Sequence, residues 1–140
     1  MATTAKTFEF EVAVGADRVA HSALGGSALP REAEWWAEHL VLAALVRCTL
    51  ASLDHHVRRA ELEASASGQA HGLVTKRVED GLYALVEVDV RLEVEVAPAP
   101  APDAVRELLA RVERGCFVGN SLTAGPRYHW TVNGEAASAT

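Results

Sequence analysis

The sequence contains two cysteines, Cys48 and Cys116, and they are its first candidates for reactive residues. Arg47 precedes Cys48 directly, and Arg114 lies two residues before Cys116. A guanidinium near a thiol stabilises the thiolate, which is the nucleophilic and oxidisable form. The sequence therefore permits redox chemistry at both positions, and the alternative is that each cysteine is a small residue packed in the core.

Glu38 is the third candidate, because it interrupts an apolar stretch ten residues before Cys48. Its alternative role is that of a surface glutamate in the first turn of a helix, where the helix dipole favours a negative charge. Trp35, Trp36 and Phe117 could line an apolar pocket, or could pack in the core or against a second subunit.

The remaining polar residues show no pattern of a metal or cofactor site. The six histidines lack a spacing such as His-Glu-x-x-His, and the two cysteines do not form Cys-x-x-Cys. The pair Gly25-Gly26 has neither the spacing nor the strand-to-helix context of a phosphate loop, and no Gly-x-Ser-x-Gly elbow occurs. We therefore expect no metal and no cofactor.

The composition predicts one globular domain. The chain has 140 residues, of which 49% are hydrophobic, and this length can bury a sizeable core. A net charge of −6 argues against nucleic acid and anionic membranes as partners. No uninterrupted apolar run approaches the length of about 18 residues that spans a bilayer, and the N-terminus lacks the apolar core of a secretory signal. We expect a cytoplasmic protein, in which two cysteines are more often reduced than bridged.

The longest predicted element is a helix over 32–59, which contains no proline or glycine and has apolar residues at helical spacing. Its middle, 40–46, is apolar on every side, so it is expected in a core or against a partner subunit. Alternating apolar residues predict the strands, and the predicted helix after the proline-rich linker has Asp103 as N-cap and Gly115 as C-cap. The other predicted elements are strands over 8–14, 18–24, 61–67, 82–96 and 126–132, a break over 68–72, a helix over 103–114 and a disordered tail over 136–140. Strands and helices are segregated, so the fold class is α+β.

Two stretches resemble motifs of the OsmC/Ohr family, the osmotically inducible and organic hydroperoxide resistance proteins. The stretch Glu38 to Cys48 resembles the motif of the family's central helix, with a glutamate ten residues before the reactive cysteine. The stretch 112–122, which contains Cys-Phe-Val-Gly-Asn-Ser-Leu, resembles the second-cysteine motif. The order of elements and the chain length also fit, so the resemblance covers most of the chain.

The resemblance implies an antiparallel sheet with a long central helix in an intertwined homodimer, and a peroxidase that reduces organic hydroperoxides. Cys48 would be the peroxidatic cysteine and Cys116 the resolving cysteine that forms a disulfide with it. Glu38 would hold a catalytic arginine, for which Arg18 is the closest match; Arg31 and Arg47 are alternatives. The reductant would be a dithiol, which in the family is often lipoyl-linked.

The chain differs from the hydroperoxide resistance branch at two positions, which indicates a divergent member. Phe117 follows the second cysteine and Ala37 precedes the glutamate, where that branch has proline in both places. The alternatives are a non-catalytic dimer of the same fold that binds a small apolar ligand, and a structural protein whose cysteines only pack.

Helix geometry provides an independent argument. Ten residues span about 15 Å of a straight helix, and the two side chains are turned by roughly 80° about its axis. Glu38 and Cys48 of one chain therefore cannot touch, unless the helix is broken. A shared site would otherwise take them from two subunits, and the apolar segment 40–46 favours that arrangement.

Overall fold

The computed structural model describes residues 5–140. The contacts within the chain divide it into two units, one ending at Trp36 and one running from Ala37 to Thr140. The expected single domain over residues 1–140 stays a prediction.

The N-terminal unit contains one short antiparallel hairpin. Strands β1 (Val12–Val14) and β2 (Ala20–Ser22) pair with Val12 opposite Ser22. The strands predicted over 8–14 and 18–24 are thus present but shorter. The turn between them places Arg18 in the left-handed region, at φ 67°, and its N–H donates to the Gly15 carbonyl at 2.9 Å.

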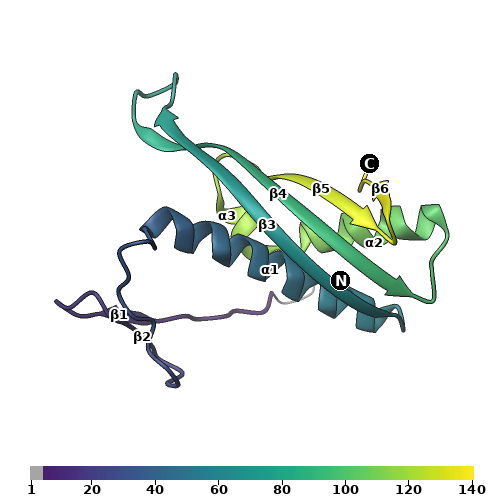
Figure 1. Ribbon diagram of the computed structural model, residues 1–140, viewed down its shortest axis with the longest axis horizontal. Helices are drawn as coiled ribbons and strands as arrows, with labels where there is room; N and C mark the ends of the chain where they lie inside the picture. The colour runs from purple at the N-terminus through teal and green to yellow at the C-terminus, as the bar shows by residue number, and fades with distance from the viewer. Residues whose placement is uncertain (1–4) are drawn as a thin grey trace. The chain divides into compact units, whose positions relative to one another are not determined.

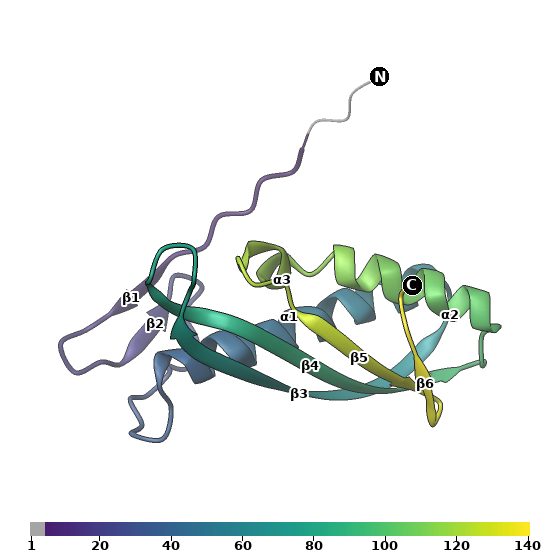
Figure 2. The ribbon, with the colours of Figure 1, turned by 90° about the horizontal axis from the view of Figure 1, so that it is seen from above.

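The C-terminal unit is a four-stranded sheet with helices packed against it, which confirms the α+β class and the long helix (Figure 1). The sheet order is β3-β4-β5-β6, as Figure 2 shows, and it is mixed because β4 and β5 run parallel while the other pairs are antiparallel. Its elements are α1 (Ala37–Arg59), β3 (Glu63–Lys76), β4 (Tyr83–Ala97), α2 (Pro102–Arg114), α3 (Phe117–Ser121), β5 (Arg127–Val132) and β6 (Glu135–Ala137).

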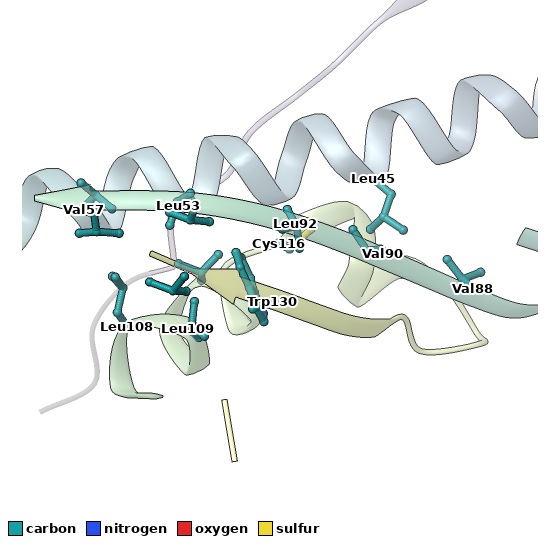
Figure 3. Close-up of a cluster of buried hydrophobic side chains, with 14 residues drawn as sticks. Leu45, Leu53, Val57, Val88, Val90, Leu92, Leu108, Leu109, Cys116 and Trp130 are labelled. Carbon is teal, nitrogen blue, oxygen red and sulfur yellow. The ribbon is translucent and has the colours of Figure 1, made fainter. Parts of the chain in front are cut away.

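The core lies between the sheet and the helices α1 and α2 (Figure 3). Strand β4 shows the predicted alternation, because five alternate residues of its second half are buried and the residues between them face outward. Helix α1 contributes Leu45 and Leu53, and α2 contributes Leu108 and Leu109. Each such leucine stabilises the fold by about 1.5–3 kcal/mol through its burial.

The break predicted at 68–72 is wrong, because β3 continues through both of its glycines. Gly68 allows a close approach of α1 to the sheet. A Cβ at this position would lie 3.0 Å from the Val46 Cγ1 and 3.2 Å from the Arg91 carbonyl oxygen. The glycines therefore serve helix packing rather than a turn.

Three further boundaries differ from the prediction. Helix α1 begins at Ala37 rather than at residue 32, because a turn closed by the Trp35 N–H and the Glu32 carbonyl precedes it. Helix α2 begins after Ala101 with Pro102 in its first turn, so Asp103 lies inside the helix and is not its N-cap. Gly115 is the C-cap, as predicted, and the short helix α3 that follows it was not predicted.

The prediction of a disordered tail over 136–140 is wrong for its first two residues. Ala136 and Ala137 pair with Thr131 and Trp130, so they form strand β6 at the edge of the sheet. The alanine-rich composition suggested disorder, whereas backbone pairing with β5 orders these residues.

Helix α1 is long and apolar enough to cross a membrane by length and composition alone, which the prediction from uninterrupted apolar runs did not foresee. Core helices pass the same test, and α1 places Leu45, Thr49 and Leu53 in the core described above. Its opposite face, with Leu40, Ala44 and others, is exposed in this chain.

Candidate functional site

The two cysteines lie close together although they are far apart in the sequence. Thr49, the residue directly after Cys48, contacts the sulfur of Cys116. Cys48 is half-buried on α1, at the edge between the face packed on the core and the exposed face. Cys116 is fully buried between Gly115, the C-cap of α2, and the first residue of α3. Both thiols are free, and Cys116 is near enough to Cys48 to raise the pKa of the Cys48 thiol. Figure 3 shows Cys116 within the core cluster.

Two hydroxyl groups surround the Cys116 sulfur. The Thr49 Oγ1 lies 3.4 Å from the Cys116 Sγ, and the Thr49 hydroxyl donates to the Leu45 carbonyl at 2.8 Å. The Tyr128 hydroxyl lies on another side of Cys116, because a Cβ at Gly119 would stand 2.5 Å from the Tyr128 oxygen and 3.3 Å from the Cys116 sulfur. Cys116 is thus held in a polar pocket inside an otherwise apolar core.

The environment of Cys48 favours the thiol over the thiolate. Burial raises the pKa of Cys48, and the neighbouring Cys116 raises it further. The backbone at Val118, and to a smaller extent at Phe117, lowers the pKa of Cys48, but burial has the larger effect. No cation is among the groups with the largest effects on the pKa of Cys48. A thiolate at this position therefore needs a positive charge from elsewhere.

The other predicted site residues are not joined to the cysteines by the contacts of the C-terminal unit. Glu38 is exposed in the first turn of α1, which is unbroken from Ala37 to Arg59. Arg47 is exposed on the same helix. Arg18 and Arg31 belong to the N-terminal unit, where the Arg18 Nη1 donates to the Ala16 carbonyl at 3.4 Å.

The three predicted pocket residues are all largely exposed. Trp35 is 51% exposed, Trp36 68% and Phe117 56%. Phe117 stands directly after Cys116, whereas the two tryptophans belong to the N-terminal unit. No group of three or more potential metal ligands occurs among residues 5–140.

Cys116 is enclosed by three residues that were not predicted as site residues, which are Thr49, Tyr128 and Gly119. Gly119 lies in α3, and a Cβ there would stand 2.5 Å from the Tyr128 hydroxyl oxygen and 3.3 Å from the Cys116 sulfur. A polar residue on the buried face of an apolar helix was the available signal for Thr49. For Tyr128 it was the alternation with Trp130 and Val132, which places all three on the core face of β5.

Comparison with known proteins gives a family and a set of structural neighbours. The family model described as OsmC-like protein matches residues 33–131. A search of curated protein sequences found no match.

The structural neighbours share the fold at low sequence identity. An OsmC-like protein of unknown function from Vibrio cholerae has a TM-score of 0.77 and 14% identity, over 89% of this chain and 100% of that one. A putative organic hydroperoxide resistance protein from the same organism, with captopril bound in one active site, has a TM-score of 0.66 and 17% identity over 96% and 98%. An organic hydroperoxide resistance protein of Bacillus subtilis has a TM-score of 0.57 and 14% identity over 91% and 98%.

Proposed function

Because the chain belongs to the OsmC-like family, we propose that it is a cytoplasmic thiol peroxidase that reduces organic hydroperoxides through Cys48 and Cys116. The observation that carries this proposal is the pair of free, neighbouring thiols in the C-terminal unit, where Thr49, the residue after Cys48, contacts the Cys116 sulfur at 3.4 Å. One thiol is partly accessible and the other is buried behind it, which suits an attacking and a resolving cysteine.

The proposed reaction begins at Cys48. Its thiolate attacks one oxygen of the peroxide, so that an S–O bond forms while the O–O bond breaks. The alkoxide leaves with the electron pair and takes up a proton to become the alcohol, and Cys48 remains as a sulfenic acid.

The second step uses Cys116. Its thiolate attacks the sulfenic sulfur, an S–S bond forms, and the leaving hydroxide takes up a proton to become water. A dithiol reductant then supplies two electrons and restores both thiols, and becomes a disulfide itself.

Activation of Cys48 in this proposal comes from an arginine, with Arg18 as the first candidate. A guanidinium beside the sulfur would offset the effect of burial, which raises the pKa of Cys48. Glu38 would hold this guanidinium through a charge-assisted hydrogen bond.

The unbroken helix α1 means that Glu38 cannot act beside Cys48 of its own chain. The two residues are ten positions apart on one continuous helix, which separates them by about 15 Å along the axis. The proposed site therefore combines residues of two subunits, and we propose a homodimer. The exposed face of α1, with Leu40, Ala43, Ala44 and Ala51, is the surface that a second copy would cover.

The proposal is tested by peroxide consumption with a dithiol reductant. The wild type should consume cumene hydroperoxide catalytically with dithiothreitol, and Cys48→Ser should not. Light scattering of the same sample should give the mass of a dimer. A wild type that consumes no peroxide would refute the enzymatic proposal. It would favour the alternative in which the same fold binds a small apolar ligand without turnover.

A further inference from the structure

Cys116 is buried, and its neighbours affect how a disulfide between Cys48 and Cys116 can be reduced. Tyr128 is the neighbour with a role in that step. We propose that the Tyr128 hydroxyl donates a hydrogen bond to the Cys116 sulfur when that sulfur leaves as a thiolate. This inference rests on the proposed function for its place in a cycle, but it concerns only the Cys48–Cys116 disulfide.

Burial decides which sulfur an external thiol can attack. Cys116 has no exposed surface, whereas Cys48 is partly exposed at the edge of the core-facing side of α1. The thiolate of the reductant therefore attacks the Cys48 sulfur. A new S–S bond forms there, the Cys48–Cys116 bond breaks, and its electron pair goes to the Cys116 sulfur. A negative charge thus arises inside the core, where an unpaired charge is costly.

The Thr49 hydroxyl already donates its one proton to another group. Its hydroxyl donates to the Leu45 carbonyl at 2.8 Å, so its contact with Cys116 at 3.4 Å leaves its oxygen as the acceptor of the cysteine S–H. A Cys116 thiolate has no proton to donate, and Thr49 could serve it only by giving up the bond to Leu45.

Tyr128 is the hydroxyl group that remains to serve as the donor. It projects from β5 toward the core, and its oxygen and the Cys116 sulfur both lie within 3.3 Å of the position that a Cβ of Gly119 would take. Burial raises the pKa of Tyr128 far above its usual value, and the neighbouring Cys116 raises it further, so the phenol keeps its proton at neutral pH. It can therefore act as a donor but not as a general base.

Gly119 lies next to both the Tyr128 hydroxyl and the Cys116 sulfur. A Cβ at this position would lie 2.5 Å from the Tyr128 oxygen, closer than Cβ atoms approach their neighbours, so the hydroxyl would have to move. The absence of a side chain at Gly119 leaves room for the hydroxyl beside the sulfur.

The test starts from the disulfide and not from the peroxide. The protein is oxidised with diamide, the Cys48–Cys116 disulfide is verified by peptide mapping, and its reduction by dithiothreitol is followed by stopped flow. Tyr128→Phe should slow the reduction about tenfold, as expected when a leaving thiolate loses a hydrogen bond. The matched control is Tyr83→Phe, the same change at an exposed tyrosine of β4, which should react like the wild type.

A purely structural effect is separated by a spectroscopic measurement. In the Cys48→Ser background, the thiolate absorbance of Cys116 at a given alkaline pH is taken as the ultraviolet difference from the same protein with Cys116→Ser, so that tyrosinate absorbance cancels. Adding Tyr128→Phe should reduce this difference, whereas adding Tyr83→Phe should not. Equal reduction rates for Tyr128→Phe and the wild type, or equal thiolate absorbance, would overturn the inference, as would the absence of the disulfide after diamide. A wild type that forms this disulfide with diamide but not with cumene hydroperoxide would refute the proposed peroxidase and leave this inference standing.

Discussion

The Thr49 hydroxyl oxygen lies 3.4 Å from the Cys116 sulfur, and this contact joins the long helix to the turn between α2 and α3. Thr49 is the residue directly after Cys48, so the same turn of α1 carries one thiol and binds the other. The two cysteines are thus held in register by a buried polar contact as well as by core packing. This arrangement suits the formation and the reduction of a disulfide between the two sulfurs.

Cys116→Ser should trap the first intermediate of the proposed cycle. Cys48 can still be oxidised in this variant, but no second thiol is available to resolve the sulfenic acid. One equivalent of cumene hydroperoxide should therefore give a Cys48 sulfenic acid that reacts with dimedone and adds its mass to the peptide. Cys48→Ser is the control, and it should show no adduct. A dimedone adduct on Cys116 of the Cys48→Ser protein would reverse the assigned roles.

Arg18→Met should slow the oxidation of Cys48 by about 10- to 100-fold, the usual effect of losing a hydrogen bond to a charged group. The reason is that burial raises the pKa of Cys48 and that no cation is among the groups with the largest effects on it. The rate of thiol loss with cumene hydroperoxide measures the effect. Arg31→Met is the matched control, and a slow Arg31→Met beside a normal Arg18→Met would move the role to Arg31.

We expect the negative charge of Glu113 to lower the stability of the fold, and its carboxyl oxygen, as a hydrogen-bond acceptor, to raise it. Burial raises the pKa of Glu113, whereas the Trp130 Nε1–H, which donates to its Oε2 at 2.9 Å, lowers it less. A raised carboxyl pKa means that stability is lost as the pH rises through the folded-state value. Glu113→Gln should therefore be at least as stable as the wild type at neutral pH. Glu113→Ala should lose about 1–3 kcal/mol, because it leaves the indole N–H without its acceptor. Urea unfolding followed by circular dichroism distinguishes the two.

Asp89 should contribute to the loss of stability in acid. Arg127, and then His129, hydrogen-bond to this carboxylate and lower its pKa from 3.8 to about 2. A carboxylate whose folded pKa is lowered stabilises the fold above its unfolded value, and this stabilisation disappears as the pH falls through the folded value. The free energy of unfolding should therefore fall between about pH 4 and about pH 2, and Asp89→Asn should make this fall shallower. Asp54→Asn, the same change at an exposed site of α1, is the control; an equal pH dependence in both variants would contradict the assignment.

The sequence predicted the elements that have a strong local period. The long helix around Cys48, the alternation in β4 and the Gly115 cap all follow from spacing within one segment. The prediction was wrong where tertiary contacts override local preference. Gly68 indicates a break by composition, yet it lies within a strand because α1 packs close against it.

The site was predictable only in its two thiols. Nothing in the spacing of the sequence indicates that Tyr128, from the fifth strand, reaches the sulfur of Cys116, because that meeting depends on how β5 and α3 pack. The activating arginine could not be determined either, because Arg18 and Cys48 lie in different units of the chain.

In the proposed function, Cys48 and Cys116 act as a pair on an organic hydroperoxide, and a count of free thiols decides whether they do. Free thiols are titrated before and after one equivalent of cumene hydroperoxide, and the product is mapped by mass spectrometry under non-reducing conditions. The proposed function predicts the loss of two thiols per chain, a Cys48–Cys116 disulfide in the map, and no loss in Cys48→Ser. Two thiols per chain that remain after the peroxide has been added would contradict it.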